Sequence, residues 1–395
     1  IREVESFNKS RKHPIQIVLI CRTFDLENDE GLKSLILVNR QRLDYNGDSQ
    51  LNWDKLEVKE LCDAEVKDIT GDIYEHLHDK LRQLIHIPSN LYIWCQLDRE
   101  IRNRPYLSQN SLIEAWWEQL SIKAETRSIA THQELIDFIN VFVERIQKSG
   151  RYEINKSLLS TSPYLLEFLS SNGLIQVNSN KISFIHQSFY DCFLIRKNFT
   201  ALLSGDSILN IIGDKSMQTP MRRYQIEILL QRLILEEPEE FLIHSRSVLR
   251  SSKVQFYYKH IVLECLGGLS TLPVGYDRFV LEYVDDSYWA KYFYHSVYWG
   301  HRPYVDLLIK TGIIQTWLHA DNKVNEAMQL LQSVNKSLND DIVDLLSPLA
   351  FKSGELDKDI QAALPPIEYQ TDKVFAFQLR LFEMHPDYIW NYYPW

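Results

Sequence analysis

A histidine at the point where a strand passes into a helix is the residue of this sequence best placed for chemistry. Residues 181–199 read KISFIHQSFYDCFLIRKNF, and residues 182–184 favour a short strand. Apolar residues recur at helical spacing after His186, which predicts a helix. A helix N-terminus favours anions, so an imidazole there can face a bound phosphate. On the residues alone, simple capping of the helix is an equally good role for His186.

The elements before His186 complete a small unit. Residues 163–173, PYLLEFLSSNG, predict a helix stopped by glycine, residues 174–177 a strand, and residues 178–180 a hairpin turn. An earlier helix is predicted over residues 131–150, with Thr131 and Glu134 as a capping box and Gly150 past its end. Helix, β-hairpin and helix are the outline of a winged helix, which we assign to residues 126–203.

The string F-x-H-Q-S-F-x-D-x-F at residues 184–193, closing such a unit, resembles the STAND class of signalling NTPases, which includes the NACHT families. The resemblance covers roughly the first half of the chain. It implies that His186 contacts the β-phosphate of a bound nucleotide, ATP or ADP, and holds a closed resting state.

A second candidate residue follows a strand near the start of the chain. Residues 15–21, IQIVLIC, form a continuous apolar run typical of a buried parallel strand, and Arg22 follows at its carboxyl end, where α/β sheets bind ligands. The resemblance implies a sensor arginine here that reaches the γ-phosphate, whereas a local ion pair with Asp25 or Glu27 is the alternative. Residues 1–61 are accordingly expected to be the C-terminal end of an α/β P-loop NTPase core.

The phosphate-binding loop of such a core is absent from the sequence. No G-x-x-x-x-G-K-[ST] motif occurs, and no apolar strand ending in paired acids precedes Ile15. The resemblance implies that these parts, with the residues that hold Mg²⁺, lie upstream of Ile1 in a longer protein. We therefore expect no ATP hydrolysis by this chain itself.

Short helices are predicted over residues 62–125, which the resemblance implies form a helical lid domain. Asp63 is a candidate N-cap for residues 63–83, and Ser111 for residues 111–120. Pro88 suits a helix start. The resemblance implies that a proline at this turn packs on the adenine, so Pro88 is the third nucleotide-binding candidate, with a plain helix start as the alternative.

The sequence has no motif that predicts a metal-binding site. His76 and His78 are two residues apart on a predicted helix and should therefore point away from each other. No H-E-x-x-H motif occurs, and the five cysteines are scattered without metal-ligand spacing, as in a reduced protein. We predict neither a metal site nor a catalytic residue.

Composition narrows the classes of partner. The 395 residues carry a net charge of −10, which argues against a broad nucleic-acid or membrane footprint. The helix predicted over residues 163–173 has no Lys or Arg, which disfavours DNA binding by the winged helix. No apolar run reaches the ~20 residues of a membrane span, and the polar start resembles no signal peptide, so a cytoplasmic location is expected.

Residues 204–395 alternate helical patterns with short turns, which predicts an α-solenoid of HEAT-like or TPR-like repeats without a fixed period. The fold class expected is therefore mainly α, and a tail is predicted to start at Leu364. Our first hypothesis is that this chain is the nucleotide-switch and ligand-sensing portion of a STAND NTPase. The resemblance implies an antiviral sensor that recognises a phage protein and forms a homo-oligomer when active. The alternative is a nucleotide-free scaffold whose solenoid binds a protein.

Overall fold

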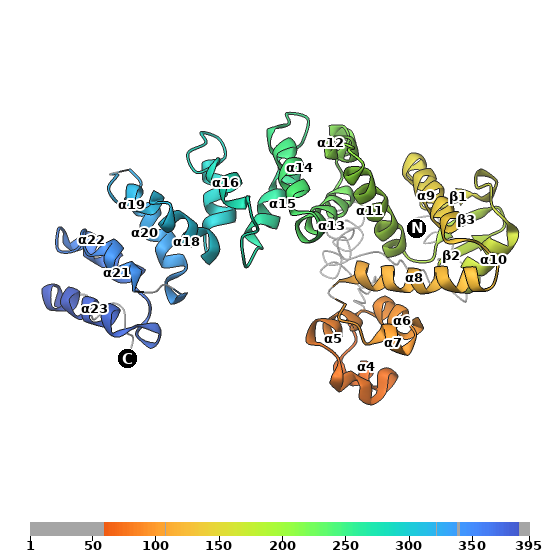
Figure 1. Cartoon of the computed structure of the whole chain (residues 1–395), viewed down its shortest axis with the longest axis horizontal. Helices are drawn as coiled ribbons and strands as arrows, with labels where there is room; N and C mark the ends of the chain where they lie inside the picture. Colours follow the sequence, from red (N-terminus) through yellow and green to blue (C-terminus); the bar gives the residue numbers. More distant parts are fainter. Residues whose placement is uncertain (1–58, 107, 321, 338–339, 387–395) are drawn as a thin grey trace, which may run out of the picture. The chain divides into compact units, whose positions relative to one another are not determined.

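The computed structural model describes residues 59–106, 108–320, 322–337 and 340–386. These residues are mainly helical, as expected, and contain one three-stranded sheet. The chain divides into two compact units between Gln109 and Asn110, and each unit is described by itself below. Figure 1 shows the elements in chain order.

The first unit consists of short helices. In chain order they are α4 (Asp63–Thr70), the 3₁₀ helix η1 (Gly71–His76), α5 (Asp79–Ile85), α6 (Pro88–Gln96) and α7 (Arg99–Arg102). The predicted N-cap at Asp63 is wrong, because Cys62 occupies that position and its backbone N–H donates to the Glu65 carboxylate at 2.8 Å. The Asp63 carboxylate instead lies 2.9 Å from Nε2 of His86.

Helix α8 (Gln109–Thr126) begins at the boundary between the units and is longer at both ends than residues 111–120. Ser111 is therefore not its N-cap, since it lies within the first turn. The two tryptophans of α8 are packing residues. Trp117 meets Phe193 with 4.9 Å between ring centroids, and Trp116 meets Phe189 at 5.1 Å.

The second unit opens with the elements that surround the sheet. They are α9 (His132–Ser149), β1 (Ile154–Asn155), the 3₁₀ helix η2 (Lys156–Leu158), α10 (Pro163–Ser171), β2 (Ile175–Asn178), β3 (Lys181–Phe184) and α11 (Gln187–Leu203). Helix α9 begins and ends as predicted. A capping box of Thr131 and Glu134 marks its start, and Gly150, in the left-handed conformation, marks its end. The strand order is β1-β3-β2, with both pairs antiparallel.

The hairpin of β2 and β3 confirms the predicted strand pair, with Ile175 opposite Phe184. Ser179 occupies the turn at a φ of 50°, in the left-handed region. Phe184 carries the sheet into the core, where its ring centroid lies 4.5 Å from that of Phe142 on α9 and 5.9 Å from that of Phe193 on α11. These rings fix the end of β3, and hence the start of α11, against the two helices.

The rest of the second unit is a series of helices with no strand among its described residues. They are α12 (Ile208–Ile212), η3 (Lys215–Met217), α13 (Pro220–Glu236), α14 (Pro238–Arg250), α15 (Phe256–Gly267), α16 (Tyr276–Leu281), α17 (Ala290–Phe293), the π-helix η4 (Tyr294–Tyr298), α18 (Arg302–Lys310), α19 (Ile313–Leu318), α20 (Val324–Ser333), η5 (Asn335–Ser337), α21 (Asp341–Leu346), α22 (Gly354–Ala363), η6 (Ile367–Tyr369) and α23 (Asp372–Met384).

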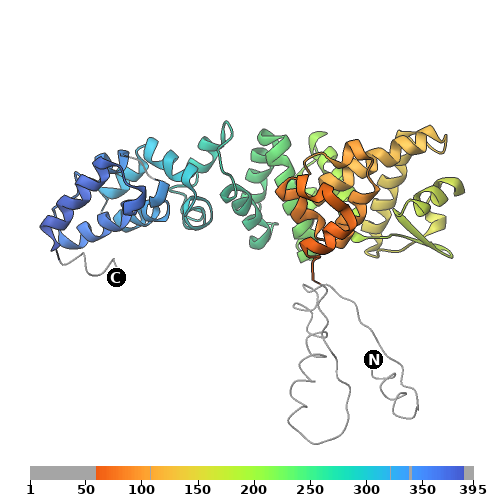
Figure 2. The ribbon, with the colours of Figure 1, turned by 90° about the horizontal axis from the view of Figure 1, so that it is seen from below.

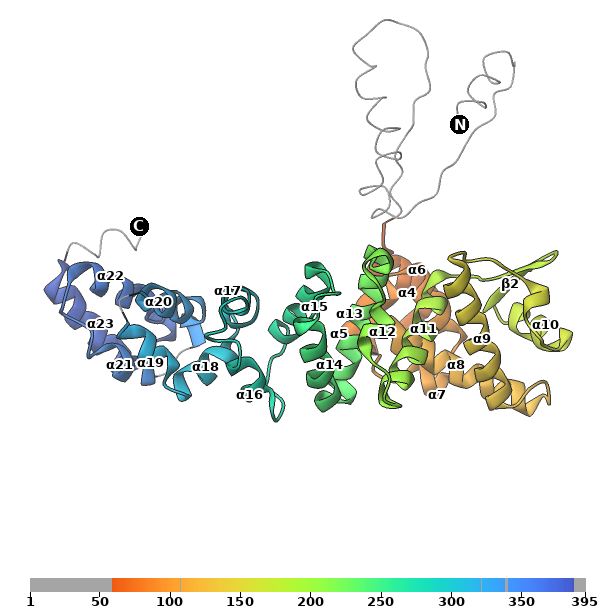
Figure 3. The same ribbon diagram turned by 90° about the horizontal axis from the view of Figure 1, so that it is seen from above.

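Helices in this series pack on the next helix and on the next but one. Helix α13 contacts both α14 and α15, and α20 contacts α22. The helices therefore lie side by side in chain order from α11 to α23, as Figures 1 and 2 show, and Figure 3 shows α13, α14 and α15 adjacent. Within the tail predicted to start at Leu364, α23 forms a helix because Val374, Phe377 and Leu381 bury one face of it.

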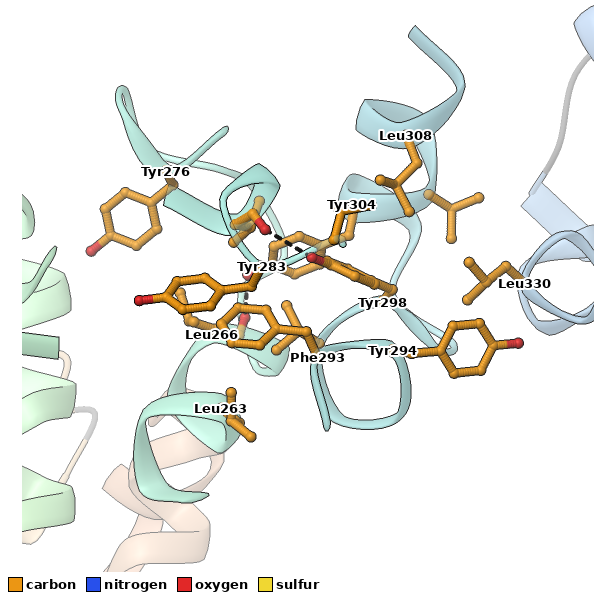
Figure 4. Close-up of a cluster of buried hydrophobic side chains, with 14 of the residues drawn as sticks. Leu263, Leu266, Tyr276, Tyr283, Phe293, Tyr294, Tyr298, Tyr304, Leu308 and Leu330 are labelled. Atoms are coloured by element: carbon orange, nitrogen blue, oxygen red, sulfur yellow. Dashed lines mark hydrogen bonds between the residues drawn. The ribbon is translucent and has the colours of Figure 1, made fainter. Parts of the chain in front are cut away.

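Tyrosine hydroxyls bond distant turns of this series together. Each donates to a main-chain carbonyl 38 or 39 residues earlier, and Figure 4 shows two of the tyrosines, Tyr276 and Tyr304, among buried neighbours. The pairs are Tyr258 with Thr219 (2.8 Å), Tyr276 with Pro238 (3.2 Å) and Tyr304 with Leu266 (2.6 Å). These three bonds each connect the helical series over a similar sequence separation.

Gly267 marks the closest approach between two of these helices. A Cβ atom at this position would lie 2.3 Å from the carbonyl oxygen of Ser296 in η4, which real side chains do not tolerate. The π-helical turn of η4 therefore packs directly against the backbone at the end of α15.

Candidate functional site

His186 is the residue between strand β3 and helix α11. Ile185, just before it, donates its N–H to the carbonyl of Leu174 at 3.1 Å, so the hairpin fixes the chain up to this point. The backbone of His186 is extended, with φ −130° and ψ 141°, as an N-cap requires. Its side chain is exposed. The structure thus confirms the predicted strand-to-helix junction and makes His186 the N-cap of a 17-residue helix.

The capping contact decides which ring nitrogen of His186 remains available. Nδ1 accepts a hydrogen bond from the backbone N–H of Ser188 at 3.2 Å and lies 2.7 Å from the Ser188 hydroxyl. A neutral imidazole that accepts at Nδ1 carries its hydrogen on Nε2. His186 therefore combines a structural role with an Nε2–H donor that can serve an anion.

The start of α11 favours negative charge. No acidic residue occurs in its first turn, so the partial positive charge of the helix N-terminus is not offset there. The nearest acid on this helix is Asp191, which is buried. Its carboxylate accepts from the side-chain amide of Gln187 at 3.2 Å and from that of Gln225 on α13 at 2.7 Å. Sequence reasoning missed the role of Asp191, although the residue lies within the F-x-H-Q-S-F-x-D-x-F string.

A cavity of about 320 Å³ lies where α9, α11 and α13 meet. Tyr190 and Gln225 are among the side chains that line it, together with Arg151 and Arg222. Burial, followed by the nearby Asp191 charge, raises the pKa of Tyr190 to about 12, so its hydroxyl stays protonated at neutral pH. His186 does not line this cavity.

Pro88 is the first residue of α6 and is exposed. The neighbouring Asn90 is fully buried, with its side-chain amide donating to the carbonyl of Leu84 at 2.9 Å, and this anchors the helix start. Tyr92, one turn after Pro88, is 53% exposed. Residues four apart share a helix face, so Pro88 and Tyr92 form a small apolar ridge. Tyr92 was not identified from the sequence.

The three nucleotide-binding candidates differ in what the structure says of them. Arg22 lies outside the described residues. Pro88 belongs to the first unit and His186 to the second, and each is described within its own unit.

In the part of the chain that the structure describes, neither a metal-binding cluster nor a disulfide is present. No group of three or more His, Cys, Asp or Glu side chains there could hold a metal ion. The four cysteines of this part are unpaired, and burial raises the pKa of the Cys192 thiol, which keeps it protonated. Within the described residues, no helix is both long and apolar enough to cross a bilayer.

Comparison with known proteins gives no match. No protein-family model matches the chain, and no curated protein matches it in sequence.

Proposed function

We propose that this chain is the nucleotide-switch and ligand-sensing portion of a STAND-type NTPase, with residues 126–203 as a winged helix and the helices from α12 onward as an α-solenoid. The observation that carries the proposal is the exposed His186 at the junction of a β-hairpin and a long helix, with its Nδ1 committed to the cap. ATP or ADP is the ligand proposed for this switch.

His186 fits a phosphate on three counts. Its Nε2–H is a donor, the start of α11 adds positive potential, and the acid nearest on that helix is buried and bound by two amides. In the proposed resting state, His186 donates to the β-phosphate and holds the winged helix in the closed arrangement. When bound, the nucleotide supplies the phosphate and adenine groups that this chain contacts.

Pro88 and Tyr92 fit the other end of such a ligand. A proline ring and a tyrosine on one exposed face offer a flat apolar surface on which adenine can pack. Arg22 is proposed to contact the γ-phosphate, and a Mg²⁺ ion would require ligands outside this chain. His186, Pro88 and Arg22 bind and orient in this scheme; none of them performs chemistry.

The helical series is proposed to recognise a protein ligand, for which the STAND resemblance suggests a phage protein. Phe256, the first residue of α15, and Tyr288, two residues before α17, are exposed. Tyr292 packs on both, at 4.7 and 5.8 Å between ring centroids. Exposed aromatic groups of this kind are common anchors in protein interfaces. Ligand binding would release the closed state and permit homo-oligomerisation.

This aromatic group also supports the second candidate function, a nucleotide-free helical scaffold. Phe256, Tyr288 and Tyr292 need no nucleotide to bind a partner. A measurement of ADP binding distinguishes the two functions. Only the switch requires that ADP bind the protein that carries this chain.

The test compares ADP affinity for the wild type and His186→Asn. Asparagine is a good N-cap, so the helix is preserved while the Nε2–H donor is lost. We expect about tenfold or more weaker ADP binding, since hydrogen bonds to charged groups contribute about 1.5–3 kcal/mol. His132→Asn, at the start of α9, is the control and should bind as the wild type does. Unchanged ADP affinity in His186→Asn would leave His186 as a helix cap alone.

A further inference from the structure

A second cavity, of about 480 Å³, lies in the first unit between η1, the start of α5 and the segment around α7. Four cationic or titratable side chains line it: His76, His78, Arg99 and Arg104. Leu77 and Leu81, both buried, lie on its apolar side together with Pro105. The volume is within the usual range for small-molecule sites.

The first of the cavity's two arginines begins α7, and the second lies two residues past its end. Arg99 and Arg104 are exposed, and neither guanidinium has a hydrogen bond or ion pair within the described residues. Arg102, between them, differs: it donates to the carbonyls of Cys95 and Leu97 and stacks over Trp94 at 4.9 Å. The contrast shows that Arg102 stabilises the end of α6, whereas Arg99 and Arg104 are available to a ligand.

Among the described residues that line this cavity, none is acidic. Asp79, at the start of α5, is paired with Arg82 at 2.8 Å and so is already compensated. A cavity with two free guanidiniums therefore occurs in a chain whose net charge is −10. Such a local excess of positive charge favours an anionic ligand.

The histidines add donors to the same cavity. His76 ends η1 and His78 is the N-cap of α5, with Leu77 extended between them. The sequence interpretation, in which both lie on one helix and point apart, is therefore wrong. Nδ1 of His78 accepts from the N–H of Lys80 at 3.3 Å, which leaves Nε2–H as its donor.

We propose that this cavity binds a small organic phosphate, with the phosphate on Arg99 and Arg104 and the apolar portion against Leu77 and Leu81. Guanidinium groups match phosphate oxygens in a bidentate fork, which favours phosphate as the anion. Neither Pro88 nor His186 lines this cavity. The proposal is therefore independent of the nucleotide switch.

The probes are inorganic phosphate and phenyl phosphate, titrated into the full chain by calorimetry. Phenyl phosphate should bind more tightly, because only it reaches the apolar side of the cavity. Arg99→Gln and Arg104→Gln should each weaken its binding about tenfold, as loss of a charge-assisted hydrogen bond does. Arg127→Gln, an exposed arginine of the second unit, is the matched control and should leave binding unchanged.

Two outcomes would overturn the proposal. Binding of phenyl phosphate by the Arg99→Gln, Arg104→Gln double variant as tight as that of the wild type would show that the arginines do not hold the phosphate. Equal affinity for both probes would remove the apolar contact. Both arginines are exposed, so these variants should unfold at the wild-type temperature, and this is checked in the same preparation.

Discussion

The buried carboxylate of Asp191 accepts a hydrogen bond from the side-chain amide of Gln225, with 2.7 Å between Oδ1 and Nε2. Asp191 belongs to α11, which follows the sheet, and Gln225 belongs to α13 of the helical series. The bond therefore joins the element that His186 caps to the helices proposed to sense a ligand. Any movement of α13 relative to α11 must break or remake it.

Gln225→Leu should lower the free energy of unfolding by about 1–3 kcal/mol, because it leaves a buried carboxylate short of a donor. Urea unfolding measures the change. Gln231→Leu, on the exposed side of α13, is the control and should stay within about 0.5 kcal/mol of the wild type. A loss in Gln225→Leu no larger than in this control would mean that the bond contributes nothing to stability.

Tyr304→Phe should also destabilise the protein, by about 1–2 kcal/mol. The tyrosine is fully buried and its hydroxyl donates to the carbonyl of Leu266 at 2.6 Å, so the substitution leaves that carbonyl without this donor. Tyr288→Phe removes a hydroxyl from a side chain that is 57% exposed and should be neutral. Thermal unfolding of the two variants compares them directly, and equal melting temperatures would refute a structural role for the Tyr304 hydroxyl.

His244 should make stability depend on pH. Burial lowers its pKa below the ordinary value of 6.5, against a smaller opposing effect of Glu240, whose carboxylate is 3.6 Å away. Below pH 6.5 the imidazole of His244 therefore binds a proton more readily in the unfolded chain than in the folded chain. The contribution of neutral His244 to the free energy of unfolding is fully present above pH 6.5. It is lost as the pH falls towards the folded-state pKa of His244.

His244→Gln should flatten this dependence in the pH range below 6.5. The measurement is the free energy of unfolding across that range for the wild type, for His244→Gln and for His295→Gln, which replaces an exposed histidine. An unaltered slope in His244→Gln would show that other groups produce the acid sensitivity.

The sequence predicted the sheet-bearing part well because its signals are local. Thr131, Glu134 and Gly150 mark both ends of α9, and a two-residue turn at Ser179 and Asn180 separates the strands. The same local reasoning found most helices of the series. It misplaced the start of α4, because Cys62 and Asp63 are adjacent and only the Glu65 contact shows which is the cap.

The remaining features depend on contacts between distant residues. Nothing local indicates that Asp191 pairs with Gln225, 34 residues away, or that α23 finds a partner in α21. The short extended link at Leu77, which brings His76 and His78 to one cavity, is also invisible to helical periodicity. The candidate role of His186 came from its position and from the STAND resemblance, and the structure adds the tautomer.

The most direct test of the proposed switch is NMR of ¹⁵N-labelled histidine side chains, recorded with and without ADP on the protein that carries this chain. Without ADP, we expect His186 to have an unprotonated Nδ1, bound to the Ser188 amide, and a hydrogen on Nε2. With ADP, the Nε2–H signal should shift and show coupling to the ³¹P of the β-phosphate. A His186 signal that is unchanged at saturating ADP would contradict the account.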